Sequence, residues 1–102
     1  MTDPVKYRRE FSRWIILVTL NNSRPLGTSE TNVLTVVRAE FPDMGRDELR
    51  RELDYLKDRY LVAIKPPPDG SPWHCDLTRH GVDIVEYTVD VHPGIARPEK
   101  YW

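Results

Sequence analysis

The chain contains a single cysteine, Cys75, among its 102 residues. One thiol excludes an intramolecular disulfide framework and a zinc site built from four thiolates, and it is typical of a reducing compartment. Long apolar runs are also missing, because the longest, Trp14–Leu20, is interrupted by Thr19 and falls far short of the roughly 18 residues that cross a membrane. We therefore expect a cytoplasmic protein with no secretory signal and no membrane partner.

The chain also lacks an excess of either charge. It has 15 Lys and Arg against 16 Asp and Glu, and a formal net charge of -1. A protein that depends on non-specific phosphate contacts usually carries a basic excess, so composition alone does not favour nucleic-acid binding. Hydrophobic residues make up 39% of the chain, which excludes disorder as the overall class and predicts one small folded domain.

Signs of catalysis or of a metal site are missing too. Only five glycines occur, with no phosphate-cradling loop and no nucleophile elbow, so we expect no enzyme activity, no cofactor and no small-molecule substrate. The one group of possible metal ligands is His74, Cys75 and His80. Alternation along a strand points His74 and Cys75 to opposite faces, which excludes a shared ion and predicts a buried Cys75.

Helical and strand patterns divide the rest of the chain into six elements and a tail. Asp3-Pro4 is typical of a helix start, and Thr28 or Ser29 is suited to cap a second helix. The expected order is α-α-α-β-β-α, mainly helical with a small hairpin, over a domain at 1–88 and an extended tail at 89–102. The predicted helices are 4–21, about 28–40, 46–60 and 79–87; the strands are 61–65 and 73–77, joined by a loop at 66–72.

The helix at 46–60 has the clearest amphipathic pattern. Leu49, Leu53, Leu56 and Tyr60 form one apolar stripe. The opposite side is mostly acidic, and three basic residues share one flank. The outward residues are Asp47, Arg51, Asp54 and Asp58, and the flank holds Arg46, Arg50 and Lys57.

Three segments carry a resemblance to a known family. Residues 49–56 running into Tyr60-Leu61-Val62 resemble the end of a winged-helix recognition helix, and residues 77–81 resemble the start of the C-terminal helix. The runs at 81–85 and 93–98 are similar to small winged-helix proteins of the late gene clusters of Mu-like phages and prophages. The chain departs from the pattern at Tyr60, where the family usually has glycine.

The resemblance implies a winged-helix (winged helix-turn-helix) DNA-binding protein in the cytoplasm of a bacterial host, with a transcription-regulating or packaging-accessory role. The loop at 66–72 would be the wing. In this arrangement the third helix enters the major groove. The residues expected to contact DNA are Arg46, Arg50, Arg51, Lys57, Lys65 and Arg79.

A second hypothesis is a winged helix that binds protein and not DNA. The acidic outer side of the helix at 46–60 opposes phosphates, and the proline-rich loop at 66–72 has no Lys or Arg. The helix at 4–21 is expected to expose basic and then apolar residues, which would meet the tail, a homodimer mate or another protein. The interface residues in this hypothesis are Arg9, Arg13, Ile16, Leu20, Tyr101 and Trp102.

Overall fold

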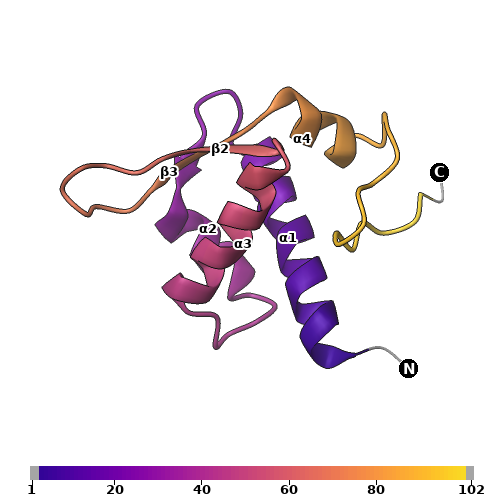
Figure 1. Ribbon diagram of the computed structural model, residues 1–102, viewed down its shortest axis with the longest axis horizontal. Helices are drawn as coiled ribbons and strands as arrows, with labels where there is room; N and C mark the ends of the chain where they lie inside the picture. Colours follow the sequence, from indigo (N-terminus) through magenta and orange to yellow (C-terminus); the bar gives the residue numbers. More distant parts are fainter. Residues whose placement is uncertain (1–2, 101–102) are drawn as a thin grey trace.

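The computed structural model describes residues 3–100 and has four helices and a three-stranded antiparallel sheet in that range (Figure 1). The strand order is β1-β3-β2. No helix within residues 3–100 has the length and apolarity needed to cross a membrane. The elements are α1 (Pro4–Asn22), β1 (Thr28–Ser29), α2 (Glu30–Val37), α3 (Arg46–Asp58), β2 (Val62–Lys65), β3 (His74–Leu77) and α4 (Arg79–Val85).

The helix starts follow the expected capping chemistry. Asp3 accepts a hydrogen bond from the backbone N–H of Val5 at 2.9 Å, and Ser29 accepts one from Asn32 at 3.3 Å. Side-chain oxygens at these positions satisfy N–H groups that have no partner inside the helix. Both predicted starts are confirmed, although α2 ends at Val37, three residues earlier than expected.

The hairpin is confirmed, and it carries a third strand that was not predicted. Val62 pairs with Leu77 and Lys65 with His74, so the strands leave a loop at 66–73 that projects from the body in Figure 1. We call residues 66–73 the hairpin loop. Thr28 and Ser29 pair with Cys75 and His74 on the other side of β3. Two residues are too few to show the alternation that identifies a strand in sequence.

The prediction for Tyr60 is wrong. Leu49, Leu53 and Leu56 are fully buried, but α3 ends at Asp58 and the Tyr60 side chain is 75% exposed. Tyr60 has a φ of 62°, in the left-handed region that favours glycine. The chain turns sharply here to enter β2, and the turn takes Tyr60 out of the helical stripe.

The prediction that Ile16 and Leu20 lie on an outer face of α1 is also wrong. Both are fully buried in the core, together with Leu17. The reason is that α1 contacts α2, α3, α4 and β3, so apolar side chains are needed on more than one side of it. These two residues are therefore not available to a partner.

The residues after α4 contain no helix or strand up to residue 100, and they pack on the body. The Ala96 N–H donates to the Glu10 carbonyl at 3.1 Å, and Ile95 is buried. The Arg97 guanidinium donates to the carbonyls of Ile84 and Val89, both at 2.9 Å. This segment thus fastens α4 to α1. Tyr101 and Trp102, expected at a protein interface, lie outside the described residues.

Candidate nucleic-acid interface

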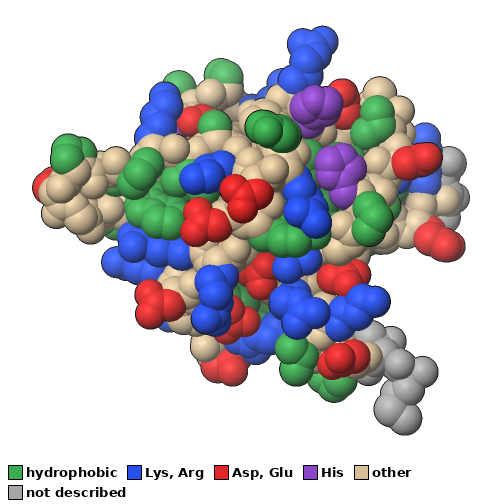
Figure 2. All heavy atoms as spheres, in the orientation of Figure 1, with side chains coloured by type: hydrophobic (Ala, Val, Ile, Leu, Met, Phe, Trp, Pro, Cys, Tyr) green, Lys and Arg blue, Asp and Glu red, His purple; other side chains and the backbone are tan. Residues whose placement is uncertain are grey.

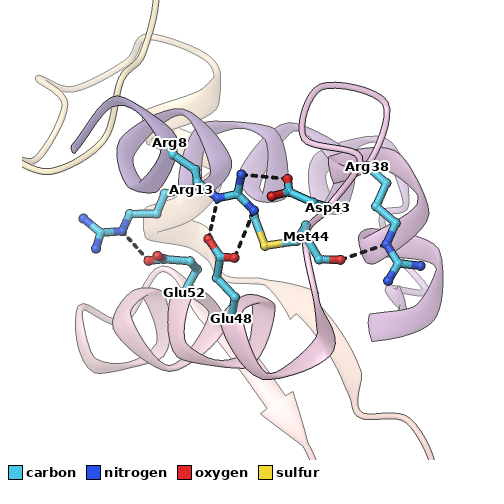
Figure 3. Close-up of polar contacts among 7 residues, drawn as sticks. All are labelled: Arg8, Arg13, Arg38, Asp43, Met44, Glu48 and Glu52. Atoms are coloured by element: carbon cyan, nitrogen blue, oxygen red, sulfur yellow. Dashed lines mark hydrogen bonds and ion pairs between the residues drawn. The ribbon is translucent and has the colours of Figure 1, made fainter. Parts of the chain in front are cut away.

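The acidic side chains on one flank of α3 are neutralised by arginines of α1 (Figure 3). The Arg8 guanidinium donates to both carboxylate oxygens of Glu48, at 2.7 and 3.0 Å, and to Asp43 at 2.9 Å. These hydrogen bonds hold the pKa of Arg8 above its ordinary value and the pKa of Asp43 below it. Glu48 and Asp43 therefore leave Arg8 little capacity for another anion.

A second ion pair on the same flank is buried. Arg13 Nε donates to Glu52 Oε1 at 2.8 Å, and both residues are less than 10% exposed. Arg13 Nη1 also donates to the Gly94 carbonyl at 2.9 Å, and the guanidinium lies 3.4 Å from the centre of the Tyr55 ring. Arg13 was predicted at a protein interface, and this is wrong because its charge is used inside the fold. Arg9 is exposed on α1, as expected.

The opposite flank of α3 faces the hairpin, and Arg50 on this flank contacts the end of the hairpin loop. Its guanidinium donates to both carboxylate oxygens of Glu30, one of them at 2.8 Å, and stacks on the Trp73 ring at 4.3 Å. Glu30 is 1% exposed and also accepts from the Trp73 N–H at 3.0 Å. Hydrogen bonds from Arg50, and then from Trp73, lower the pKa of Glu30.

These contacts join the start of α2, the middle of α3 and the end of the hairpin loop. Arg50 was expected to contact DNA, but a buried carboxylate, that of Glu30, compensates its charge. Glu30 and Trp73 are site residues that sequence reasoning missed. They are 43 residues apart, and no local pattern indicates that they meet.

Two further cations share the hairpin-facing flank with Arg50. At 100° per residue, Arg46, Arg50 and Lys57 fall within about 40° of one another. Lys65 ends β2 opposite His74, at the base of the hairpin loop. The side chains of Arg46, Lys57 and Lys65 are exposed and form no hydrogen bond or ion pair with any described residue. We call Arg46, Lys57 and Lys65 the basic flank. Figure 2 shows Lys and Arg side chains spread over this face of the molecule, some of them near the base of the projecting loop, with Asp and Glu among them.

Arg79 does not join this group. It begins α4 directly after β3, at the end of the strands away from the hairpin loop. There it lines a polar hollow with Arg24, Asp83 and Glu86. Arg79 is exposed, but its place in the fold separates it from the basic flank.

The outward side of α3 is exposed and mixed in charge, as predicted. Asp47, Asp54 and Asp58 surround one cation, Arg51. The side chains of these four residues form no hydrogen bond or ion pair with a described residue, although Asp47 and Asp54 interact electrostatically with Arg50. This surface repels phosphates over most of its length, while the basic flank beside it attracts them.

The hairpin loop is stiff and uncharged at all positions but one. Asp69 accepts a hydrogen bond from the Ser71 N–H at 3.0 Å, and the bonds from Ser71 lower the pKa of Asp69. Gly70 at the tip has a φ of 81°, which a side chain would strain. Proline at 66, 67, 68 and 72 fixes φ along the rest of the loop.

Possible metal ligands and the single thiol are the other reactive groups that the sequence raised. No group of three or more His, Cys, Asp or Glu residues within 3–100 could hold a metal ion. Cys75 is buried as predicted, and desolvation raises the pKa of its thiol to about 12, which makes it a poor nucleophile. The His74 side chain is close to an acid and not to Cys75, since its Nε2 atom lies 3.4 Å from Asp76 Oδ2.

Comparison with known proteins adds no family. No family model matches the chain, and no curated protein or solved structure shows significant similarity to it.

Proposed function

We propose that the chain is a winged-helix protein that binds duplex DNA, with α3 in the major groove and the hairpin loop as the wing. Three features support this arrangement. The element order of helices and hairpin is that of winged helices, α3 presents an exposed side, and the hairpin loop projects beside it (Figure 1). The small strand β1 completes the sheet on the far side of β3.

The basic flank is the observation that carries the proposal. When a helix lies in the major groove and a wing reaches the next minor groove, a phosphate strand passes between them. Arg46 and Lys57 lie on the side of α3 that faces the hairpin, and Lys65 lies at the base of the loop. None of the three side chains forms an ion pair with a described carboxylate, although Arg46 interacts electrostatically with Glu30. Each can therefore neutralise a phosphate and release a counterion.

The ion pairs explain how a chain with a net charge of -1 could bind DNA. Acidic residues on the α1 side of α3 are neutralised by Arg8 and Arg13. The cations that remain available include three beside the hairpin. We extend the proposal to a transcriptional or packaging-accessory role in a bacterial host, the role that the resemblance to proteins of Mu-like phages implies.

The test is fluorescence anisotropy with a labelled 30-base-pair duplex of random sequence at about 50 mM salt. We expect wild-type protein to bind, and the double variant Arg46→Ala, Lys65→Ala to bind about tenfold or more weakly. The matched control is Arg9→Ala, Arg79→Ala, which removes two exposed cations that form no ion pair with described residues and lie away from the hairpin loop. Equal losses in both double variants would contradict the proposal.

Protein binding remains a second candidate because of a shallow apolar groove between α1 and α2. Phe11, Trp14, Ile15 and Val18 line it together with Val36, which is 44% exposed. The partner of this candidate function is a second copy of the chain. Sedimentation would then show a wild-type dimer that Val36→Asp converts to a monomer, and a wild-type monomer at 100 µM would exclude it.

A further inference from the structure

Arg51 is the one cation on the outward side of α3, and its surroundings differ from those of the basic flank. Asp47 lies four residues before it and Asp54 three residues after it, so a carboxylate lies about one helical turn away on each side. The Arg51 side chain is exposed and forms no hydrogen bond or ion pair with a described residue. A free guanidinium between two carboxylates is a poor site for a phosphate, because the acids repel it.

The edges of the bases suit this position better than phosphates do. In the major groove, guanine presents the acceptors O6 and N7 in a spacing that the two-pronged guanidinium matches. Base edges carry only partial charges, so the neighbouring aspartates repel them far less than they repel phosphates. The outward direction of Arg51 on α3 is the one that faces the floor of the groove when the basic flank lies along the backbone.

We infer that Arg51 reads guanine in the DNA, while Arg46, Lys57 and Lys65 hold the backbone without reading sequence. This inference rests on the proposed function. It predicts that the chain prefers duplexes with a guanine at one fixed position. It also assigns different consequences to the loss of two exposed arginines on one helix, Arg51 and Arg46.

The experiment is selection of bound duplexes from a randomised library, followed by affinity measurements on the selected site and on a copy with that guanine pair replaced by an A·T pair. For wild-type protein we expect a preference of roughly 5- to 150-fold for the guanine site. Arg51→Ala should reduce that preference to below about twofold. Arg46→Ala, the matched control, should weaken binding to both duplexes by the same factor and leave the preference intact.

The variant Arg51→Lys tests whether the guanine preference depends on the guanidinium hydrogen-bond donors or only on the positive charge. It keeps the cation but lacks the planar pair of donors, so the preference should fall although the charge is unchanged. Circular dichroism checks that each variant folds. Binding of wild-type protein without any guanine preference, or an equal effect of Arg51→Ala on both duplexes, would overturn this inference and leave the proposed function standing. Absence of binding to every duplex would overturn both.

Discussion

Removing the Arg13 side chain should destabilise the domain far more than removing an exposed arginine. In Arg13→Ala, the Glu52 carboxylate stays less than 10% exposed but loses the hydrogen bond that Arg13 provides at 2.8 Å. Leaving one member of a buried ion pair without its partner costs about 3–5 kcal/mol. The change also removes the donor to Gly94 and the cation over the Tyr55 ring.

The stability of the whole domain sets the scale for this loss. Domains of this size unfold with about 5–15 kcal/mol, so Arg13→Ala should lower the urea midpoint by a large fraction of its value. The matched control is Arg9→Ala, an exposed change on the same helix, which should stay within about 0.5 kcal/mol of wild type.

A double variant distinguishes two contributions to the free energy of unfolding: the penalty of leaving Glu52 buried without its partner, and the net stabilisation from the ion pair. Arg13→Met with Glu52→Leu removes both charges and keeps much of the packing volume, and such replacements are often neutral. We expect it to be clearly more stable than Arg13→Ala in equilibrium urea unfolding. If the double variant is no more stable than Arg13→Ala, or if Arg13→Ala matches Arg9→Ala, the reasoning about the buried charge is refuted.

Three further changes test other parts of the fold. Tyr60→Gly should stabilise the domain by about 0.5–1 kcal/mol, since it relieves a left-handed residue whose side chain is exposed; a lower melting temperature would refute this. Ser12→Ala should raise stability by about 1 kcal/mol, because the buried Ser12 hydroxyl has no hydrogen-bond partner among the described residues; a destabilised variant would refute this. The lowered pKa of Glu30 means that its ionised form stabilises the fold above the ordinary glutamate pKa and that this contribution is lost as pH falls through the folded pKa. The stability difference between wild type and Glu30→Gln, measured by urea unfolding from pH 7 to pH 3, should therefore shrink as pH falls, and a constant difference would contradict it.

Local patterns predicted the elements that position the site. The stripe of Leu49, Leu53 and Leu56 identified α3, and a proline-rich segment between two strand patterns identified the hairpin. These features depend on residues close in sequence, where periodicity and turn chemistry act. The prediction that Tyr60 belongs to this stripe is wrong because the backbone leaves the helix before Tyr60. An apolar spacing of four residues cannot reveal that change of backbone conformation.

Local patterns could not predict which side chains of α1 are buried. Helical spacing orders the residues around α1, but it does not say how many neighbours surround the helix. A single buried stripe on α1 would leave Ile16 and Leu20 facing outward, whereas α1 is covered by helices and by β3 and both residues are buried. Burial of a central helix depends on the packing of the whole domain.

Charge was the hardest property to assign from sequence. The three arginines Arg8, Arg13 and Arg50 are bound to carboxylates 20 to 40 residues away, and only the tertiary fold brings those groups together. Arg46, Lys57 and Lys65 look no different in sequence, yet they have no such partner among the described residues. Counting charges gives the total, while the fold decides which of them can meet DNA.

The salt dependence of DNA affinity tests the central claim most directly. If Arg46, Lys57 and Lys65 each neutralise one phosphate, log affinity against log salt should have a slope of about -2.7 or steeper, a loss of about 40-fold or more between 50 and 200 mM salt. The double variant Arg46→Ala, Lys65→Ala should reduce the steepness of that slope by about 2. No binding to duplex DNA at tens of micromolar protein and 50 mM salt, or a slope that the double variant leaves unchanged, would contradict the account.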